Sequence, residues 1–342
     1  MLTHAIVAAA DQAWPPFVLV AGLLLVGAAE AADGLFEATG ARLALSRLGG
    51  RGLLLVLLAL VAAVTALLNL DTSVVFLTPV LVHAARHRDL DERPFLYGSV
   101  FMANAASLLL PGSNLTNLLV LRTDPRDGAV FALHMLPAWL AACAITAAFV
   151  TLAFPAGGKT RQAPGEPTAI RLRVGAAATL ASAALVVALP SPAIPVLAVG
   201  LAATALQRLR PRLDAGVLTF LFALTVGLGT IARVWHGPAG LVESSGTWAV
   251  AGLGAAASLL VNNLPATVLL TARPPAHPDA LLLGLDLGPN LAVTGSLSAV
   301  LWLRAARATG ARPSIATYTR LGVLLVPLTL TAAVAVQALT GG

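Results

Sequence analysis

The sequence contains few charged residues and almost no cysteine. Asp, Glu, Lys and Arg make up only 11% of its 342 residues, whereas 58% are hydrophobic and the mean hydropathy is +0.87. A soluble domain is about 25% charged, so this composition excludes a soluble globule and a disordered chain. The single cysteine, Cys143, excludes an intrachain disulfide and a metal site of several thiolates. A protein that lies largely within a membrane is the class that remains.

Motifs for nucleotide, metal and cofactor chemistry are missing from the sequence. It contains no GxxxxGK[ST] phosphate loop, no HExxH and no Cys/His spacing typical of a metal site. We therefore expect neither a metal nor another cofactor, and we do not expect an enzyme. Active transport by this chain would need an ion gradient or a separate ATPase subunit as partner.

Long apolar blocks are present along the whole chain. A helix that crosses a membrane needs about 20 apolar residues. Two pairs of short segments, at 53–85 and 247–272, are interpreted as re-entrant hairpins. Two longer blocks with polar, Gly- and Pro-containing interruptions, at 95–121 and 280–303, are interpreted as broken helices. Full spans are predicted at 14–32, 130–154, 173–189, 192–206, 215–232 and 317–339.

The order of these elements occurs twice. Residues 1–155 are predicted to form one repeat (span, hairpin, broken helix, span), and residues 215–342 a second repeat in the same order. Residues 156–214 would form a cytoplasmic loop and a connecting helix pair. Because each repeat makes an odd number of crossings, the second begins on the opposite side of the membrane. Such inverted repeats are typical of secondary transporters. The predicted fold is thus an all-α polytopic membrane protein with inverted repeats, each containing a re-entrant hairpin and a broken helix.

The basic residues predict how the chain is oriented. With both termini outside, all but four of the 21 Lys and Arg residues fall in cytoplasmic loops or at cytoplasmic ends of spans, as the positive-inside rule requires. The net charge of +6 is then a topology signal, and nucleic acid is not an expected partner. The expected location is the inner or plasma membrane, with the lipid bilayer as partner. The N-terminus does not show the pattern of a cleaved signal peptide.

Four polar segments interrupt the apolar sequence, at the two hairpin tips and the two helix breaks. Polar groups are costly in hydrocarbon, and irregular backbone is tolerated there only when it is buried in protein or lines a cavity. Helix N-termini offer N–H groups to anions or polar oxygens, and C-terminal carbonyls suit cations. We therefore expect one mid-membrane site for a small inorganic or organic solute. Its predicted binding residues are Asn69, Thr72, Ser113, Asn114, Asn117, Asn262, Asn263, Asn290, Thr294, Gly295 and Ser296.

Two carboxylates lie within these polar segments, Asp71 and Asp286. An ionisable side chain inside a membrane is a candidate for binding the coupling ion, H⁺ or Na⁺. Each also has a structural alternative: Asp71 could cap the helix that begins near Thr72, and Asp286 could pair with a neighbour in the same break. The Asn, Ser and Thr side chains could likewise serve only to join helices.

The same polar segments resemble those of the ion transporter superfamily. They are most similar to the arsenical pump (arsenite efflux) membrane proteins and to divalent-anion/sodium symporter-like permeases. The stretches that carry the resemblance are LDTSVVFLTPVLV (70–82), NAASLLLPGSNLTNLLV (104–120), VNNLPATVLL (261–270) and LGLDLGPNLAVTGSLSAVLWL (283–303). The resemblance implies an elevator-type transporter, in which hairpins and broken helices move against flanking spans, and usually a homodimer. The chain is shorter than typical members of this family, which puts the completeness of the scaffold in question.

The solute hypothesis follows from the charge of Asp71. A dicarboxylate beside this side chain would be repelled, which favours a neutral hydroxide such as As(OH)3, or a cation, exchanged for protons. The leading hypothesis is therefore proton-coupled efflux of arsenite or antimonite by a permease that works as an antiporter. One alternative is a sodium-coupled symporter of citrate, another dicarboxylate or sulfate. Another is a membrane scaffold or partner subunit that transports nothing.

Overall fold

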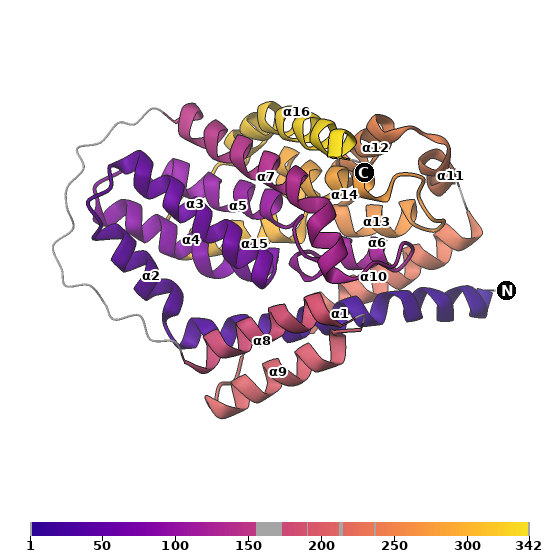
Figure 1. Ribbon diagram of the computed structural model, residues 1–342, viewed down its shortest axis with the longest axis horizontal. Coiled ribbons are helices and arrows are strands. Elements are labelled where there is room, and N and C mark those ends of the chain that lie inside the picture. The colour runs from indigo at the N-terminus through magenta and orange to yellow at the C-terminus, as the bar shows by residue number, and fades with distance from the viewer. Residues whose placement is uncertain (1, 155–172, 190, 212–214, 236, 341–342) are drawn as a thin grey trace.

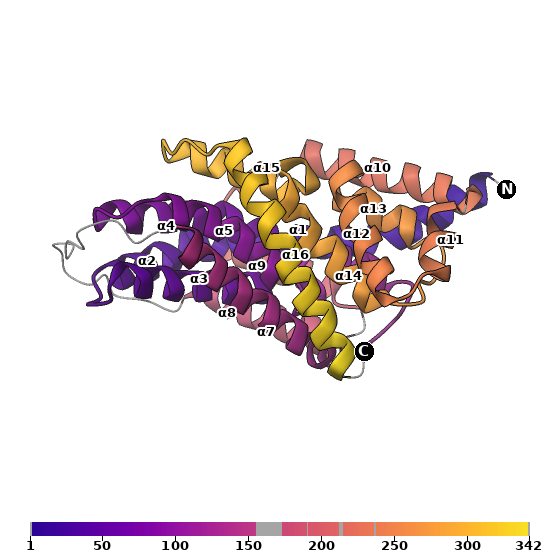
Figure 2. The ribbon, with the colours of Figure 1, turned by 90° about the horizontal axis from the view of Figure 1, so that it is seen from above.

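The computed structural model describes residues 2–154, 173–189, 191–211, 215–235 and 237–340. Within these ranges the chain is helical and contains no strand. Figure 1 shows the helices gathered around one long axis, and Figure 2 shows the same arrangement from above. The predicted all-α class is therefore confirmed.

The first half of the chain contains the first hairpin and the first broken helix. Asn69 separates the two arms of the hairpin, and a short 3-10 turn interrupts the broken helix. One short helix, which the sequence did not predict, follows the first span. The elements are α1 (Leu2–Ala32), α2 (Leu35–Ala44), α3 (Gly50–Leu67), α4 (Leu70–His87), α5 (Arg93–Ala106), η1 (Pro111–Ser113), α6 (Leu115–Leu121) and α7 (Gly128–Ala153).

The second half repeats this order after a connecting helix pair. The pair is α8 (Val174–Ala188) and α9 (Ala193–Leu206). A short extra helix again follows the first span of the repeat. The elements are α10 (Ala215–Val234), α11 (Gly237–Ser244), α12 (Thr247–Val261), α13 (Asn263–Leu270), α14 (Pro278–Leu287), η2 (Gly288–Leu291), η3 (Val293–Gly295), α15 (Leu297–Ala308) and α16 (Ile315–Thr340). The division of the chain at residues 155 and 215 stays a prediction.

The lengths of the helices change the argument that both hairpins are re-entrant because their arms are short. Four described helices, α1, α3, α7 and α16, are long and apolar enough to cross a membrane, and α10 with α11, bent by 73°, gives a fifth. Both arms of the first hairpin have 18 residues, so each is about 27 Å long, close to the hydrocarbon thickness of about 30 Å. Length alone therefore does not make this hairpin re-entrant. The second hairpin is shorter, with arms of 15 and 8 residues.

The hairpins of the two repeats lie toward opposite ends of the long axis. In Figures 1 and 2, α2 to α5 fill the left half and α11 to α14 fill the right half, while α1 runs along the molecule. Helices α8 and α9 pack on α1, and α7 packs on α16. The approach of α9 to α1 depends on two glycines, because a Cβ on Gly200 would lie 2.6 Å from the carbonyl oxygen of Gly22.

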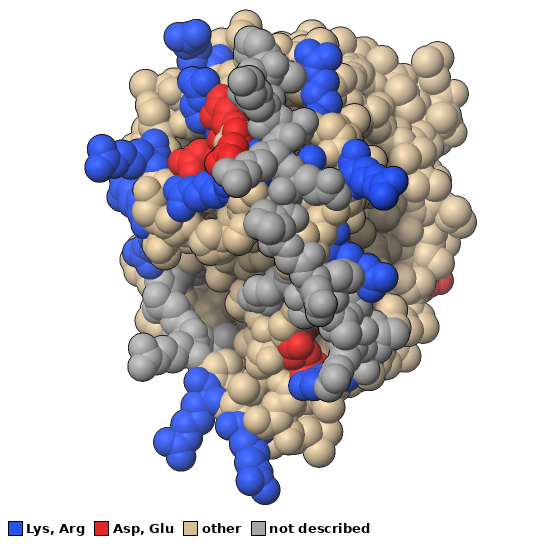
Figure 3. Space-filling view, turned by 90° about the vertical axis from the view of Figure 1, so that its left-hand side faces the viewer, with Lys and Arg blue, Asp and Glu red and all other residues tan. Residues whose placement is uncertain are grey.

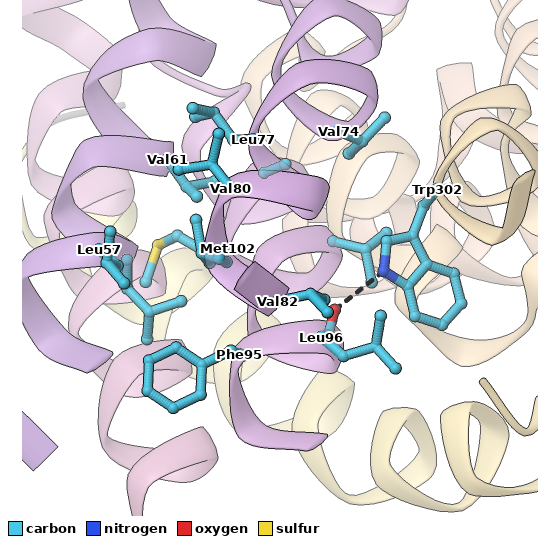
Figure 4. Close-up of a cluster of buried hydrophobic side chains, with 14 of the residues drawn as sticks. Leu57, Val61, Val74, Leu77, Val80, Val82, Phe95, Leu96, Met102 and Trp302 are labelled. Carbon is cyan, nitrogen blue, oxygen red and sulfur yellow. Dashed lines mark hydrogen bonds between the residues drawn. The ribbon is translucent and has the colours of Figure 1, made fainter. Parts of the chain in front are cut away.

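The largest apolar core joins the two repeats. Figure 4 shows Trp302 of α15 beside residues of α4 and α5, and its indole Nε1–H donates to the Leu96 carbonyl at 2.8 Å. Trp302 and Tyr318 are fully buried, and their rings lie 5.5 Å apart. Helix α15 of the second repeat is thus fixed within the first, and this contact brings the helix breaks of both repeats together.

The end of the molecule that carries α2 to α5 is rich in arginine. Figure 3 views that end and shows more Lys and Arg than Asp and Glu on the described surface. Exposed arginines on elements of this end include Arg47, Arg51, Arg86 and Arg93. Four other basic residues of the predicted cytoplasmic set lie outside the described residues: Lys159, Arg161, Arg171 and Arg212. The orientation of this end in a membrane stays a prediction.

Candidate functional site

Each of the four polar segments begins a helix with a side-chain cap. The oxygen of the capping residue accepts a hydrogen bond from a backbone N–H in the first turn, which satisfies a group that the helix leaves free. The four bonds are Asn69 Oδ1 with Thr72 N at 2.7 Å, Asn114 Oδ1 with Thr116 N at 3.3 Å, Asn262 Oδ1 with Leu264 N at 3.3 Å, and Ser296 Oγ with Ala299 N at 3.1 Å. The sequence therefore starts α4, α6, α13 and α15 at these positions.

The four helix N-termini line one small cavity. Its volume is about 40 Å³, which is close to the space of one water molecule, about 30 Å³. Helices α1 and α10 add an apolar wall. The lining residues are Phe17, Val20, Asp71, Asn114, Leu115, Thr116, Leu218, Asn262, Asn263, Leu264, Leu297 and Ser298. Segments that lie almost 200 residues apart in the sequence thus meet at one place.

Asp71 belongs to the cavity wall. It is the second residue of α4 and accepts a hydrogen bond from the Ser298 hydroxyl of α15 at 2.5 Å. An acidic side chain in the first helical turn is favoured by the helix dipole. Asp71 does not cap α4, because Asn69 performs that role. The carboxylate is therefore available to a bound solute.

Asp286 lies behind the wall. It sits near the end of α14 with 1% of its surface exposed. Its Oδ1 accepts hydrogen bonds from Asn114 Nδ2 at 3.0 Å and from the Thr116 hydroxyl, whereas its Oδ2 has no partner among the described residues. The predicted partner within its own break does not occur; its partners come from α6 of the other repeat.

The predicted binding residues divide into three groups. Asn114, Asn262 and Asn263 line the cavity. Asn69 and Ser296 cap helices beside it, and the Asn69 Nδ2 has no partner among the described residues. The others do not line it: Thr72, Ser113, Asn117, Asn290, Thr294 and Gly295.

Three residues of the third group, Ser113, Asn117 and Asn290, hydrogen-bond to the backbone of the breaks. Ser113 exchanges hydrogen bonds with the backbone of Leu110. Asn117 donates to the carbonyls of Ser107 at 2.8 Å and Leu110 at 3.1 Å. Such bonds satisfy carbonyl groups that the interrupted α5 leaves free.

The same pattern occurs around the second break. Asn290 accepts from Asn104 Nδ2 at 2.7 Å and donates to the Phe101 carbonyl at 3.4 Å. The Thr294 carbonyl accepts from Asn262 Nδ2 at 3.0 Å. A Cβ on Gly295 would lie 2.8 Å from Cα of Pro289.

Thr72 is buried in the contact between α4 and α1. A Cβ added to Gly27 of α1 would overlap its methyl group. Its hydroxyl has no partner among the described residues, and Thr72 is not among the residues that line the cavity. Thr72 therefore acts in helix packing.

Two functional candidates were missed from the sequence, Thr116 and Ser298. Both hydroxyls bond an intramembrane carboxylate. When residues 104–122 are aligned with 286–304, Asn114 falls opposite Ser296 and Thr116 opposite Ser298. The repeated pattern of a cap followed two residues later by a hydroxyl was the signal that could have identified them.

The cavity has no basic side chain. Its described lining residues include no Lys, Arg or His, and Asp71 is its one charged residue. In the described part of the chain no group of three or more His, Cys, Asp or Glu could hold a metal ion. The cavity therefore offers helix N–H groups, amides, hydroxyls and a carboxylate, which suits an uncharged solute that donates and accepts hydrogen bonds.

A larger groove lies elsewhere, between α1, α6 and the α8–α9 turn. Its volume is about 820 Å³, and its walls include Trp14, Leu118, Arg122 and Ile194. None of the predicted binding residues is among those that line this groove. Size alone does not outweigh the convergence of four capped helix ends, so the small cavity is the candidate site.

Two comparisons with known proteins indicate transport, and a third concerns the fold. The sequence model of the CitMHS family, described as citrate transporter, matches residues 1–338. The silicon efflux transporter LSI3 of Oryza sativa subsp. japonica is 32% identical over 144 residues, which is 41% of this chain but only 30% of that relative. The crystal structure of the YdaH transporter of Alcanivorax borkumensis superposes with a TM-score of 0.58 and 17% identity, covering 99% of this chain and 88% of that chain. The last likeness concerns the fold alone.

Proposed function

This chain belongs to the CitMHS citrate transporter family, a family of membrane transporters, and from that premise we propose that it exports arsenite or antimonite in exchange for protons. The observation that carries the proposal is the convergence of four capped helix N-termini on a cavity whose described lining residues include Asp71 and no basic side chain. The chain is a multi-pass membrane protein, and we propose that both termini lie outside and that the arginine-rich end faces the cytoplasm.

The chemistry of the cavity supports an uncharged hydroxylated solute. As(OH)3 donates and accepts hydrogen bonds. The amides of Asn262 and Asn263 can supply both kinds of partner, whereas Asn114, whose Nδ2 already donates to Asp286 and Ser107, can only accept through Oδ1. An ionised Asp71 accepts hydrogen bonds from solute hydroxyls but repels a carboxylate. At 4 Å and an effective dielectric constant of 20 that repulsion is about 4 kcal/mol. The relative that exports silicon fits this chemistry, since silicic acid is also an uncharged hydroxylated species.

Transport needs a movement of the elements around the cavity. A volume of about 40 Å³ is far below the roughly 300 Å³ of an ordinary ligand site. We propose that the hairpins α3–α4 and α12–α13 and the broken helices move as a unit against the remaining spans, as in an elevator, with two copies forming a homodimer. Asp71 and Asp286 would bind the coupling ion.

Sodium-coupled uptake of citrate, another dicarboxylate or sulfate is the second candidate. The family description favours it, and so do the positive ends of four helix dipoles. Asp71 opposes it, because the cavity has no described basic side chain to balance a second negative charge.

The test is transport by the purified chain in proteoliposomes. A pH gradient should drive accumulation of arsenite without ATP and without sodium, and citrate and sulfate should neither be transported nor compete. Sodium-dependent citrate uptake would support the second candidate. If no solute moves and neither antimonite nor an oxyanion raises the thermal stability, the chain is a scaffold or a subunit that needs a partner such as an ATPase.

A further inference from the structure

The two carboxylates of the polar segments, Asp71 and Asp286, are each hydrogen-bonded by a hydroxyl from the opposite repeat. Ser298 of the second repeat donates to Asp71 of the first at 2.5 Å. Thr116 of the first repeat donates to Asp286 of the second. Thr116 and Ser298 are both the second residue of the helix that follows a break. The repeats therefore form two crossed carboxylate–hydroxyl pairs.

A hydroxyl partner suits a carboxylate that changes its protonation. Ser and Thr hydroxyls donate to an ionised carboxylate and accept from a protonated one, whereas an amide NH2 group only donates. Each pair can thus keep its hydrogen bond in both protonation states. At Asp286 the two bonds from α6 occupy Oδ1, and the buried Oδ2 has no described partner, so Oδ2 can take a proton without breaking a bond.

The two pairs are separate. No hydrogen bond joins the two carboxylates in the described part of the chain, and their donors come from different helices. They also differ in position, since Asp71 lines the cavity and Asp286 lies behind it. Two carboxylates with separate partners can each hold a proton, unlike a close pair that shares one.

Other ionisable groups do not contact these carboxylates. Helices α6, α12 and α13 carry none. On the other helices packed against α4 or α14, no described side chain of this kind hydrogen-bonds to either carboxylate, and Tyr318 instead donates to the Pro289 carbonyl at 3.1 Å. The residues concerned are His4, Asp11, Glu30, Arg42, Arg51, His83, Arg86, His87, Arg93, Tyr97, Asp279, Arg304, Arg307, Tyr318 and Arg320.

We propose that the transporter binds two coupling protons in each cycle, one at the Asp71–Ser298 pair and one at the Asp286–Thr116 pair. The proposal rests on the proposed function of proton-coupled transport. The proton on Asp71 competes directly with the solute, because this carboxylate lines the cavity. The proton on Asp286 acts through Asn114 and Thr116, which bond to this carboxylate and line the cavity themselves.

The number of protons is measured as a zero-flux gradient. The full chain is placed in proteoliposomes with the membrane potential held at zero, and the arsenite gradient at which net flux stops is recorded at several pH differences. Each coupled proton raises the arsenite concentration ratio at zero flux about tenfold for each unit of pH difference across the membrane. With two protons, the wild type should therefore give a ratio of about 100 per pH unit. Asp71→Asn and Asp286→Asn should each give about tenfold, and the double variant no dependence on pH. Ser99→Ala, which removes a buried hydroxyl outside the cavity, should keep the wild-type value.

Each outcome decides between the two proposals. A wild-type gradient of about tenfold per pH unit overturns the two-proton proposal and leaves proton coupling intact. No arsenite gradient at any pH difference refutes the proposed function itself. If an Asp variant does not fold, Ser298→Ala and Thr116→Val provide the test: each should shift the pH of half-maximal transport, and an unchanged pH profile in both overturns the proposal.

Discussion

Replacing Asp71 by Asn should open the cavity to anions. The substitution keeps the size of the side chain and can still bond to Ser298, which lies 2.5 Å from the carboxylate. It removes the one charge among the described lining residues. The repulsion of about 4 kcal/mol between this charge and a carboxylate 4 Å away corresponds to about a thousandfold in affinity. Solvent and motion weaken this repulsion, so the affinity of Asp71→Asn for these anions should exceed that of the wild type by about 100-fold.

The assay is competition by citrate, succinate and sulfate against antimonite binding to purified protein. The wild type should show no competition in the millimolar range, and Asp71→Asn should show it. Glu30→Gln is the matched control, because Glu30 is a buried carboxylate on α1 that accepts a hydrogen bond from Thr179 outside the cavity. Equal anion competition in the wild type and in Asp71→Asn would refute the argument that this charge selects the solute.

Three further substitutions test the structure around the site by thermal unfolding in detergent. Asn262 has a φ of 78°, which glycine adopts freely. Asn262→Gly should therefore lower the free energy of unfolding by only a few tenths of a kcal/mol. Asn262→Ala is strained and also loses the cap, so it should lower the free energy of unfolding by about 1–2 kcal/mol. Trp302→Phe should lower stability by more than about 0.6 kcal/mol, because it loses the bond to Leu96 and leaves a void at a fully buried position; an unchanged melting temperature would contradict that role. Gly200→Val should abolish folding, because its Cβ would lie 2.6 Å from the Gly22 carbonyl; a folded, active variant would show that α9 does not pack on α1 as described.

Local sequence signals were sufficient to predict most of the helices and the breaks, but not the short helices α2 and α11. Asn69, Asn114 and Asn262 stand between apolar runs, and each caps the helix that follows. Helix ends were less accurate, since α3 begins at Gly50 and α4 extends to His87, beyond the apolar blocks. Polar residues at the end of an apolar helix can continue its hydrogen bonding, which hydropathy does not detect.

The sequence could not predict which polar residues line the cavity and which ones bond to the backbone of the breaks. An Asn in a helix break can line a cavity, as Asn114 does, or hold free carbonyls, as Asn117 does, three residues along the same helix. That difference depends on which side of α6 faces the second repeat. The bond of Ser298 to Asp71 likewise requires α15 to pack against α4, which is a tertiary contact with no local sequence signal.

The most direct test of the central claim is to locate antimony in a structure of the full chain determined with antimonite. The claim is that the four capped helix ends form the solute site. The account predicts antimony within hydrogen-bonding reach of Asn114, Asn262 and Asn263, beside the carboxylate of Asp71. Antimony bound instead in the groove beside Trp14 and Arg122, with the central cavity unchanged, would contradict it.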